Sequence, residues 1–342
     1  MTSQPILDPT LAEKPYVFGV DVGGTGIKIG LVDNRGRTLA FVAMATEEPK
    51  GPEDAMRRVA ETCRSMVQSL DLNWSDVSNI GLGTPGSQDI PQGMLIEPPN
   101  HPHWHHFPIV ACLEKQIQKP VFFINDANAA AFGEFWVGTG SDHQSMVMLT
   151  LGTGVGGGII IDGHLVVGKN SFGGECGHML IDPSPNARLC VWGGGKGQLE
   201  AYASASAIAA RAQEAVDQGQ ATLLEAHSGS ITSKSVYEAA IAGDDYSLSL
   251  VDSTAYYLGI AITTLVHTLD PGLIVLGGAV DFGGKDCPIG QRFLAEIKRV
   301  FQERSFEHIV NATRIEFASI GSDAGYLGAA GFARFGGKAA VN

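Results

Sequence analysis

Apolar runs separated by short glycine-containing turns dominate the N-terminal part of the chain. Tyr16–Asp21, Ile27–Val32 and Thr38–Met44 are rich in β-branched and aromatic residues, a composition typical of strands. The tight turns between them predict a meander of three antiparallel strands. Apolar residues then recur at helical spacing over Glu53–Leu70, which predicts an amphipathic helix. Two short buried strands are predicted next, at Ile80–Gly83 and Val121–Ile124.

The same order of elements recurs in the second half of the chain. Ser145–Leu151, Gly158–Ile161 and His164–Val167 predict a second meander, and Asp162-Gly163 is a hairpin turn signal. Further elements are predicted downstream, with helices near Gln198–Gln213, Ser235–Ala242, Tyr246–Thr268, Gln291–Glu303 and Asp323–Phe335 and a strand at Leu273–Leu276. A strand triplet followed by helices and strands, occurring twice, predicts an α/β protein with two related lobes that face one another across a cleft.

Composition narrows the class of protein. A chain of 342 residues that is 44% hydrophobic is long enough to form two lobes of ordinary domain size. The formal net charge is -13 and no long run of Lys and Arg occurs, so we expect neither nucleic acid nor an anionic membrane as partner. No signal peptide and no uncharged apolar stretch of roughly 18 residues is evident, and the five cysteines lack CxxC spacing. We therefore expect a cytoplasmic protein without a disulfide framework.

Two glycine clusters occupy equivalent turns in the two meanders. Asp21–Gly26 reads DVGGTG, and Leu151–Gly158 reads LGTGVGGG. Glycine turns of this kind let backbone N–H groups approach phosphate oxygens, and a carboxylate at the strand end suits a hydrated Mg²⁺. The first cluster is neither a GxxxxGK[ST] loop nor a strand-to-helix GxGxxG, because Ile27–Val32 continues as a strand. Ordinary tight turns are the alternative, but the repetition favours two turns that bind one polyphosphate.

Three further segments carry candidate polar chemistry. Gly277-Gly278 follows the buried run LIVL, where missing side chains leave room for an adenine or ribose. Asn125-Asp126 opens a helix directly after a strand, which fits either a helix N-cap or a base that deprotonates a sugar hydroxyl. Gly173–Met179 and Glu200 add Glu and His side chains that suit recognition of hydroxyl groups.

Taken together, the motifs resemble the ROK family of sugar kinases and sugar-responsive repressors, within the actin-like ATPase superfamily. The resemblance extends from about Tyr16 to Phe335. Six motifs occur in family order: VDVGGTGIKIGLVD, GLGTPG, EPPNHPHW, INDANAAAFGE, LGTGVGGGII and GGECGHM. The resemblance implies a two-lobed, ribonuclease H-like fold with the active site in the cleft. The implied division is an extension at 1–15, a small lobe at 16–124 plus 323–342, and a large lobe at 125–322.

The resemblance also implies roles for individual residues. Asp126 would be the general base that takes the proton from the primary hydroxyl of a hexose as that oxygen attacks the γ-phosphoryl group of ATP. The implied sugar-binding residues are Gly83, Asn100, Asn125, Asp126, Glu175, His178 and Glu200. The implied nucleotide-binding residues are Asp21, Gly23, Gly24, Thr25, Lys28, Gly152, Thr153, Gly154, Gly277 and Gly278. Asp21 would hold Mg²⁺ through water.

The chain departs from the family in the segment that holds a structural zinc in many members. Those members use the His of the GHM segment and three Cys in a C-x-C-G-x-x-G-C-x-E run. When the run is aligned on its glycines and on Glu200, the three cysteine positions hold Val191, Gly193 and Gln198, and Cys190 is one residue out of register. Structural zinc needs four closed ligands, so we predict no zinc. Packing around Trp192 would then replace the metal, and His178 would be left as a sugar contact.

The histidine-rich segment around Trp104 also suggests a metal site at first sight. However, Asn100 and Trp104 match the family's sugar-binding loop, and the flanking prolines predict an exposed, rigid turn, so we favour the sugar-binding interpretation.

Several functional alternatives remain open from the sequence. A sugar-responsive repressor needs a helix-turn-helix module, for which residues 1–15 are too few. Polyphosphate is a second possible phosphoryl donor, although Gly277-Gly278 favours ATP. Glucose is the favoured hexose through resemblance to glucokinase members, whereas relatives phosphorylate fructose, mannose, N-acetylglucosamine or N-acetylmannosamine. Family members are commonly dimers, so we expect a homodimer.

Overall fold

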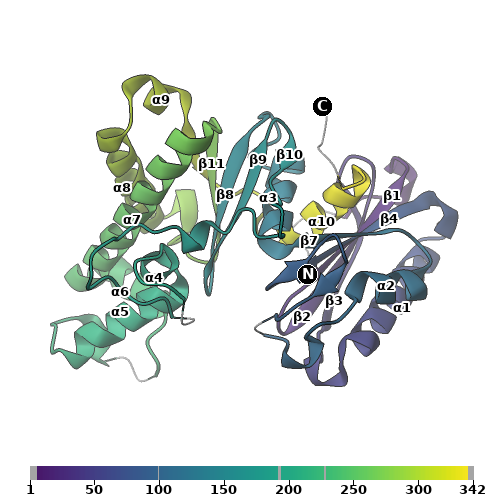
Figure 1. Ribbon diagram of the computed structural model, residues 1–342, viewed down its shortest axis with the longest axis horizontal. Coiled ribbons are helices and arrows are strands. Elements are labelled where there is room, and N and C mark those ends of the chain that lie inside the picture. The colour runs from purple at the N-terminus through teal and green to yellow at the C-terminus, as the bar shows by residue number, and fades with distance from the viewer. Residues whose placement is uncertain (1–5, 99, 192–193, 227–228, 338–342) are drawn as a thin grey trace. The chain divides into compact units, whose positions relative to one another are not determined.

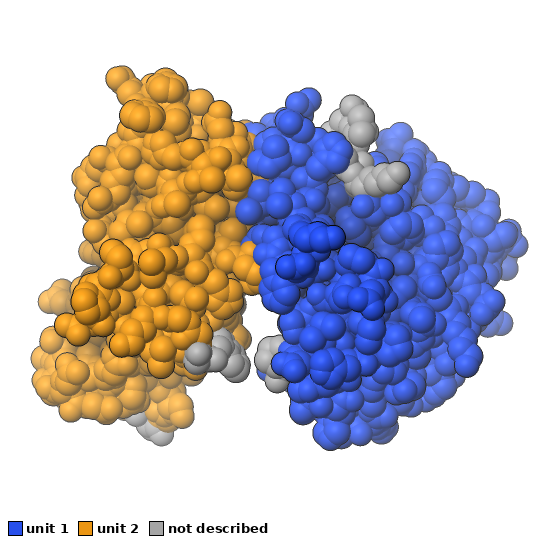
Figure 2. Space-filling view, in the orientation of Figure 1, with its two compact units in different colours: residues 1–145, 158–174, 319–342 blue, residues 146–157, 175–318 orange. Residues whose placement is uncertain are grey.

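The computed structural model describes residues 6–98, 100–191, 194–226 and 229–337 (Figure 1). It has the α/β fold class that the sequence predicts. The chain divides into two compact units, coloured separately in Figure 2. Unit 1 comprises residues 1–145, 158–174 and 319–342, and unit 2 comprises residues 146–157 and 175–318.

Unit 1 is built on a five-stranded sheet with the strand order β3-β2-β1-β4-β7. The strands are β1 (Tyr16–Val22), β2 (Gly26–Val32), β3 (Thr38–Ala45), β4 (Val77–Thr84) and β7 (Val121–Asn125). β2 pairs antiparallel with β1 and β3, which confirms the first meander, whereas β4 runs parallel to both β1 and β7. A small two-stranded sheet, β5 (Gln88–Asp89) and β6 (Met94–Leu95), lies in the connection between β4 and β7.

Helices cover both faces of this sheet (Figure 1). α1 (Pro52–Ser69) and α2 (Ile109–Ile117) pack with Phe18 and Val20 of β1, and α10 (Ala324–Arg334) packs with Val17 on the opposite face. Successive side chains of a strand point to opposite faces, so one apolar strand supplies both cores. β1 and β4 carry Gly19 and Gly81 beneath α10, where an added Cβ would lie 1.8 Å from the carbonyl oxygens of Tyr326 and Ala329, respectively. Glycine at these positions allows the close approach of α10.

The observed units differ from the predicted lobes in where the chain divides. The prediction assigns residue 125 onward to the large lobe, but α3 (Asp126–Val137) and residues 158–174 belong to unit 1. The physical reason is the packing of α3 on α10. Gly328 touches the backbone of Ala129 so closely that an added Cβ would lie 1.6 Å from its carbonyl oxygen.

The second five-stranded sheet has the order β10-β9-β8-β11-β12. Its strands are β8 (Met146–Leu151), β9 (Val155–Ile161), β10 (His164–Leu165), β11 (Leu273–Gly278) and β12 (Arg314–Phe317). β11 runs parallel to β8 and β12. The helices of unit 2 are α4 (Glu200–Ala203), α5 (Ala205–Asp217), α6 (Ser233–Ile241), α7 (Asp245–Leu269), α8 (Pro288–Arg304) and α9 (Glu307–Ala312).

The single helix predicted over Gln198–Gln213 is in fact two helices, α4 and α5. Ser204 between them has extended backbone angles, and its side chain accepts a hydrogen bond from the backbone N–H of Ala207. Ser204 is therefore the N-cap of α5, and its extended backbone separates α4 from α5.

α7 is the one helix in the described part of the chain that is long and apolar enough to cross a membrane. Its side chains at Leu258, Ile262 and Val266 are fully buried, and the helix packs along α8. These contacts identify α7 as the core helix of unit 2.

Candidate active site

The β1–β2 turn holds the first group of predicted nucleotide-binding residues. The Gly23 N–H donates to the carbonyl oxygen of Gly26 at 2.8 Å, which closes the turn. The Gly23 carbonyl accepts from the Thr46 hydroxyl at 2.7 Å. Because Gly24 and Thr25 are exposed, this closed turn presents its backbone to solvent as a phosphate-binding turn requires.

Asp21, the predicted magnesium residue, lies at the end of β1. Its carboxylate packs against α10, where a Cβ added to Gly325 would lie 2.4 Å from Asp21 Oδ2. Burial raises the pKa of Asp21, and the nearby Lys28, its cross-strand partner in β2, opposes that rise. The Lys28 ammonium donates to the carbonyl of Ser322. A carboxylate beside the predicted phosphate-binding turn is the type of oxygen ligand that Mg²⁺ accepts, directly or through water.

Asn125 is the last residue of β7, and Asp126 is the first residue of α3. The Asn125 side chain is the N-cap, because its Oδ1 accepts from the N–H groups of Ala127 at 2.9 Å and Asn128 at 3.4 Å. Asp126 is the first helical residue and also accepts from the Ala127 N–H, at 2.9 Å. Gly83 stands in the neighbouring strand, opposite Ile124. Asn125 is therefore the N-cap of α3, and Asp126 is the first helical residue after it.

The Asn100 loop lies against the β1–β2 turn. A Cβ added to Gly24 would meet Asn100 Cβ at 3.4 Å, so a predicted sugar residue and a predicted phosphate residue are neighbours. His101 reinforces this contact, since its Nε2 lies 3.3 Å from the Gly23 carbonyl and its ring packs on Trp104.

The prediction of an exposed turn around Trp104 is wrong for the centre of this loop. His101 and Trp104 are each 1% exposed, because the Trp104 indole N–H donates to the Glu48 carbonyl and anchors the loop. Burial lowers the pKa of His101. His103 is exposed and pairs with the Glu48 carboxylate at 2.8 Å. Among the described residues no group of three or more His, Cys, Asp or Glu is arranged to hold a metal ion.

The second group of predicted nucleotide residues meets in unit 2, at the ends of β8 and β11. The Gly152 N–H donates to the Gly154 carbonyl at 2.9 Å, which closes the turn around Thr153. Gly277 and Gly278 pair with Thr150 and Leu151 of β8. Gly278 has φ +98°, and an added Cβ would lie 2.3 Å from the Leu151 carbonyl oxygen. Only glycine fits this backbone. The two predicted segments lie side by side, because they are at the ends of paired strands.

Glu200 joins this turn as its buried carboxylate. It is 6% exposed, and its Oε2 accepts from the Val155 N–H at 2.9 Å. Its Oε1 accepts from the Cys190 thiol at 2.9 Å. Gly154 packs against the same carboxylate, since an added Cβ would lie 2.3 Å from Oε2. The Cys190 contact was missed from the sequence, in which Cys190 was only a zinc ligand out of register.

Glu175 and His178 lie in the segment that packs on β9 through Gly177. Both side chains are about half exposed, and His178 Nε2 lies 3.8 Å from Glu175 Oε2. His178 Nδ1 lies 3.2 Å from Oε1 of Gln198, the residue at one of the family's zinc-cysteine positions. An amide oxygen only accepts, so this contact is a hydrogen bond in the tautomer of His178 that carries its proton on Nδ1. Trp192, whose packing was predicted to replace zinc, lies outside the described residues.

The predicted residues are thus divided between the two units. The β1–β2 turn, Asn100 and the Asn125-Asp126 pair lie in unit 1, and the β8–β9 turn, Gly277-Gly278 and Glu200 lie in unit 2.

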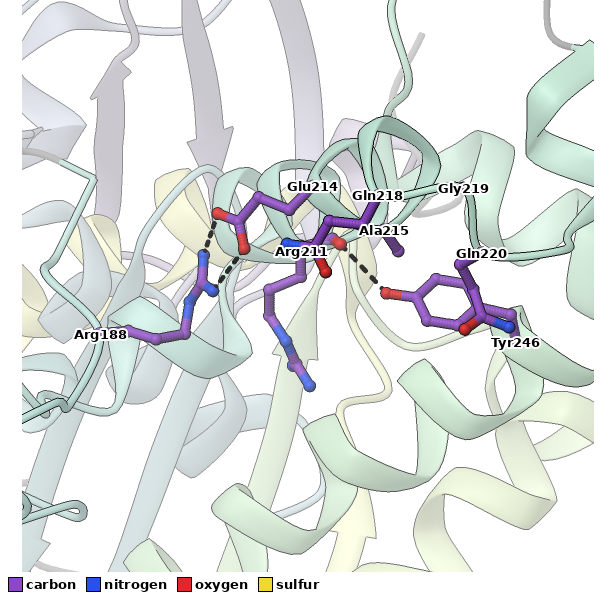
Figure 3. Close-up of a pocket in the computed structure, with 8 residues that line it drawn as sticks. All are labelled: Arg188, Arg211, Glu214, Ala215, Gln218, Gly219, Gln220 and Tyr246. Atoms are coloured by element: carbon purple, nitrogen blue, oxygen red, sulfur yellow. Dashed lines mark hydrogen bonds and ion pairs between the residues drawn. The ribbon is translucent and has the colours of Figure 1, made fainter.

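A separate pocket of about 390 Å³ lies elsewhere in unit 2, at the C-terminal end of α5 (Figure 3). Arg188 there forms a double hydrogen bond with Glu214 at 2.7 Å. Arg211 donates to the Tyr202 carbonyl and to Ser253, and burial lowers its pKa, with Arg188 adding to that shift. Because the terminal nitrogens of both guanidinium groups already have acceptors, we assign this pocket no ligand.

Comparisons with known proteins show the family to which the chain belongs. Residues 17–335 match the ROK family. A glucokinase of Halalkalibacterium halodurans is 36% identical over 322 residues, which cover 93% of this chain and 94% of that protein. The ROK hexokinase of Thermus thermophilus superposes with a TM-score of 0.78 at 33% identity, covering 92% of this chain and 96% of that one.

A third relative is a ROK family glucokinase from Streptomyces griseus, crystallised in complex with glucose and AMPPNP. It superposes with a TM-score of 0.71 at 31% identity and covers 92% of this chain and 98% of that one. The chain therefore belongs to the ROK family and has the actin-like ATPase fold of the sugar kinases in that family.

Proposed function

We propose that this protein is an ATP-dependent glucokinase that phosphorylates the 6-hydroxyl of glucose. Relatives named as glucokinases that match along nearly their whole length support the activity and the substrate. The observation that carries the proposal is the position of Asp126, which is the first residue of α3 and directly follows the N-cap Asn125 at the end of β7. A carboxylate at the end of a strand, beside a phosphate-binding turn, suits a general base.

In the proposed reaction Asp126 accepts the proton of the glucose 6-hydroxyl as that oxygen bonds to the γ-phosphorus of ATP. The bond from the γ-phosphorus to the β,γ-bridging oxygen breaks, and ADP leaves with that oxygen. Positioning and charge stabilisation supply most of the catalysis in phosphoryl transfer. We assign Asn100, Glu175, His178 and Glu200 to the sugar hydroxyls.

The nucleotide is assigned to the glycine turns of both units and to Lys28. Mg²⁺, bound through Asp21, would neutralise charge on the phosphates. The AMPPNP complex of the Streptomyces griseus relative supports ATP as donor. We further propose that no structural zinc is bound, that the protein is a homodimer, and that it acts in the cytoplasm.

The first experiment is an assay of ADP release with Mg-ATP across a panel of hexoses and N-acetylhexosamines, using protein stripped of metal and protein supplied with zinc. Turnover on glucose that zinc does not change supports the proposal. Turnover only on another sugar would mean that glucose is not the substrate. Activity only with polyphosphate would mean that ATP is not the phosphoryl donor. The absence of phosphorylation with every sugar and every donor contradicts an enzymatic role.

The role of Asp126 is tested by Asp126→Asn. We expect kcat to fall at least about a hundred-fold, the usual effect of losing a general base, whereas glucose affinity by calorimetry stays nearly unchanged. Asp245→Asn is the matched control, because Asp245 is also the first residue of a helix but is exposed at α7. Near-normal turnover in Asp126→Asn would show that Asp126 is not the general base.

A further inference from the structure

Glu200 is held by two donors of different kinds, one of which the family motif does not supply. The Val155 N–H belongs to the backbone of β9, whereas the second donor is the Cys190 thiol. We propose that Cys190 is a positioning residue for sugar binding, which fixes the orientation of the Glu200 carboxylate. This inference rests on the proposed function, in which Glu200 accepts hydrogen bonds from sugar hydroxyls.

The loop around Cys190 is built so that its thiol reaches Glu200. The Arg188 N–H donates to the Tyr202 hydroxyl at 2.9 Å, and the Gly197 N–H donates to the Arg188 carbonyl at 2.8 Å. These bonds fix the loop before and after Cys190, which is 2% exposed and packs with Ala201 and Tyr202. The side chain therefore has little freedom to turn away from the carboxylate.

A thiol suits this position for two chemical reasons. It is a small, largely apolar group that fits the contact with Ala201, and its S–H is a neutral donor. A neutral donor leaves the negative charge on Glu200, which strengthens hydrogen bonds that the carboxylate accepts from a ligand. Two carboxylate oxygens offer about four acceptor sites, and the two donors occupy only one site on each oxygen.

Loss of the thiol donor would leave Glu200 held through Oε2 alone. Its Oε1 would then have to be ordered when sugar binds, which weakens affinity. A hydrogen bond to a charged group contributes enough that its loss corresponds to roughly a tenfold weaker equilibrium. The effect belongs to binding and not to proton transfer, because Cys190 donates to Glu200, which is assigned to the sugar hydroxyls, whereas Asp126 is the proposed base.

The test compares Cys190→Ser, which keeps a donor, with Cys190→Val, which keeps the shape and removes the donor. We expect Cys190→Val to raise the KM and Kd for glucose roughly tenfold, with kcat and the KM for ATP changed less than about twofold. Cys190→Ser should restore most of the affinity. Cys63→Val is the control, since Cys63 is a fully buried thiol of α1 in unit 1. Equal affinities for the Ser and Val variants, both unfolding like wild type, would overturn the inference.

A measurement without substrate separates this inference from the proposed function. The Raman S–H stretching band of Cys190, isolated as the difference between wild type and Cys190→Val, should lie at the lowered frequency of a hydrogen-bonded thiol. Glu200→Gln should shift the band upward. A band at the position of a free thiol contradicts the inference even if glucose is phosphorylated. Failure of wild type to phosphorylate glucose contradicts the proposed function and leaves the Raman result to decide the Cys190–Glu200 contact.

Discussion

Glu134 is a fully buried carboxylate near the end of α3. It accepts hydrogen bonds from two separate segments of the chain. Its Oε1 accepts from the backbone N–H groups of Ser319 at 3.0 Å and Ile320 at 2.8 Å. Its Oε2 accepts from the Thr139 N–H at 2.8 Å. Thr139 lies in the segment that leads from α3 to β8, and Ser319 is the residue at which the chain returns to unit 1. We predict that Glu134 is a major contributor to the stability of unit 1.

The expected magnitude follows from the donors that would lose their acceptor. Glu134→Ala leaves three backbone N–H groups without it, and each unsatisfied buried group costs about 1–3 kcal/mol. Water can reach the exposed Ser319 and the partly buried Thr139, so we expect a loss of about 3–5 kcal/mol in the free energy of unfolding. Glu134→Gln keeps one oxygen and turns an amide N–H₂ toward one set of donors, so it should cost about 1–2 kcal/mol.

The assay is urea unfolding followed by tryptophan fluorescence and by circular dichroism, because Trp136 lies in α3 two residues from Glu134. Glu61→Ala is the control, since Glu61 is an exposed carboxylate of α1. The reasoning is refuted if Glu134→Ala costs less than about 1 kcal/mol, or if the Gln and Ala variants are equally unstable. A second perturbation of the same contact is Gly138→Ala, whose Cβ would lie 2.2 Å from Glu134 Oε2.

Three further predictions test other contacts. Gly154→Ala places a Cβ 2.3 Å from Glu200 Oε2, so the KM for glucose should rise at least about tenfold, and an unchanged KM would exclude this carboxylate from the sugar site. Gly81→Ala places a Cβ 1.8 Å from the Ala329 carbonyl, so thermal unfolding should occur at a clearly lower temperature, unless α10 moves away without cost. The third prediction concerns the fully buried Asp33. Burial raises the pKa of its carboxyl, but the hydrogen bonds that it accepts, chiefly from the Arg37 side chain, outweigh burial and lower the pKa. A carboxyl with a lower pKa in the folded state stabilises the fold above its unfolded pKa near 3.9 and loses that effect as pH falls through its folded pKa. Asp33→Asn should therefore weaken stability at pH 7 and flatten the fall in urea midpoint below about pH 4; an unchanged acid slope would contradict this.

Much of the fold was predictable because local pattern and tertiary structure agree in it. The strands β1, β2 and β3 and the helix α1 lie within a few residues of their predicted ranges, since β-branched runs, glycine turns and helical spacing are all local properties. β12 was missed, because Arg314–Phe317 is too short for its alternation to stand out from the flanking polar residues. Ser204 was read as helix interior, although its capping of α5 depends only on a local side chain that the sequence shows.

The positions of most candidate residues at strand ends were predictable from the same local signals. The glycine turns and the Asn125-Asp126 pair follow strands, and the order of elements places such loops at strand ends. The buried centre of the Trp104 loop was not predictable, because its proline-rich sequence suggests exposure and its burial depends on the Glu48 carbonyl far along the chain.

The sequence by itself determined the class of fold, the positions of the glycine turns and the polar residues offered to a ligand. Only the tertiary structure decided which of those side chains are fixed by hydrogen bonds, and which residues are their partners. Cys190 reaches Glu200 because a loop folds back on α4, and Glu134 reaches Ser319 across 185 positions of the chain. Both contacts exist because a buried polar group must find a partner. The partner of Glu134 comes from a distant part of the sequence, and the partner of Glu200 comes from a nearby loop whose path the local pattern does not specify.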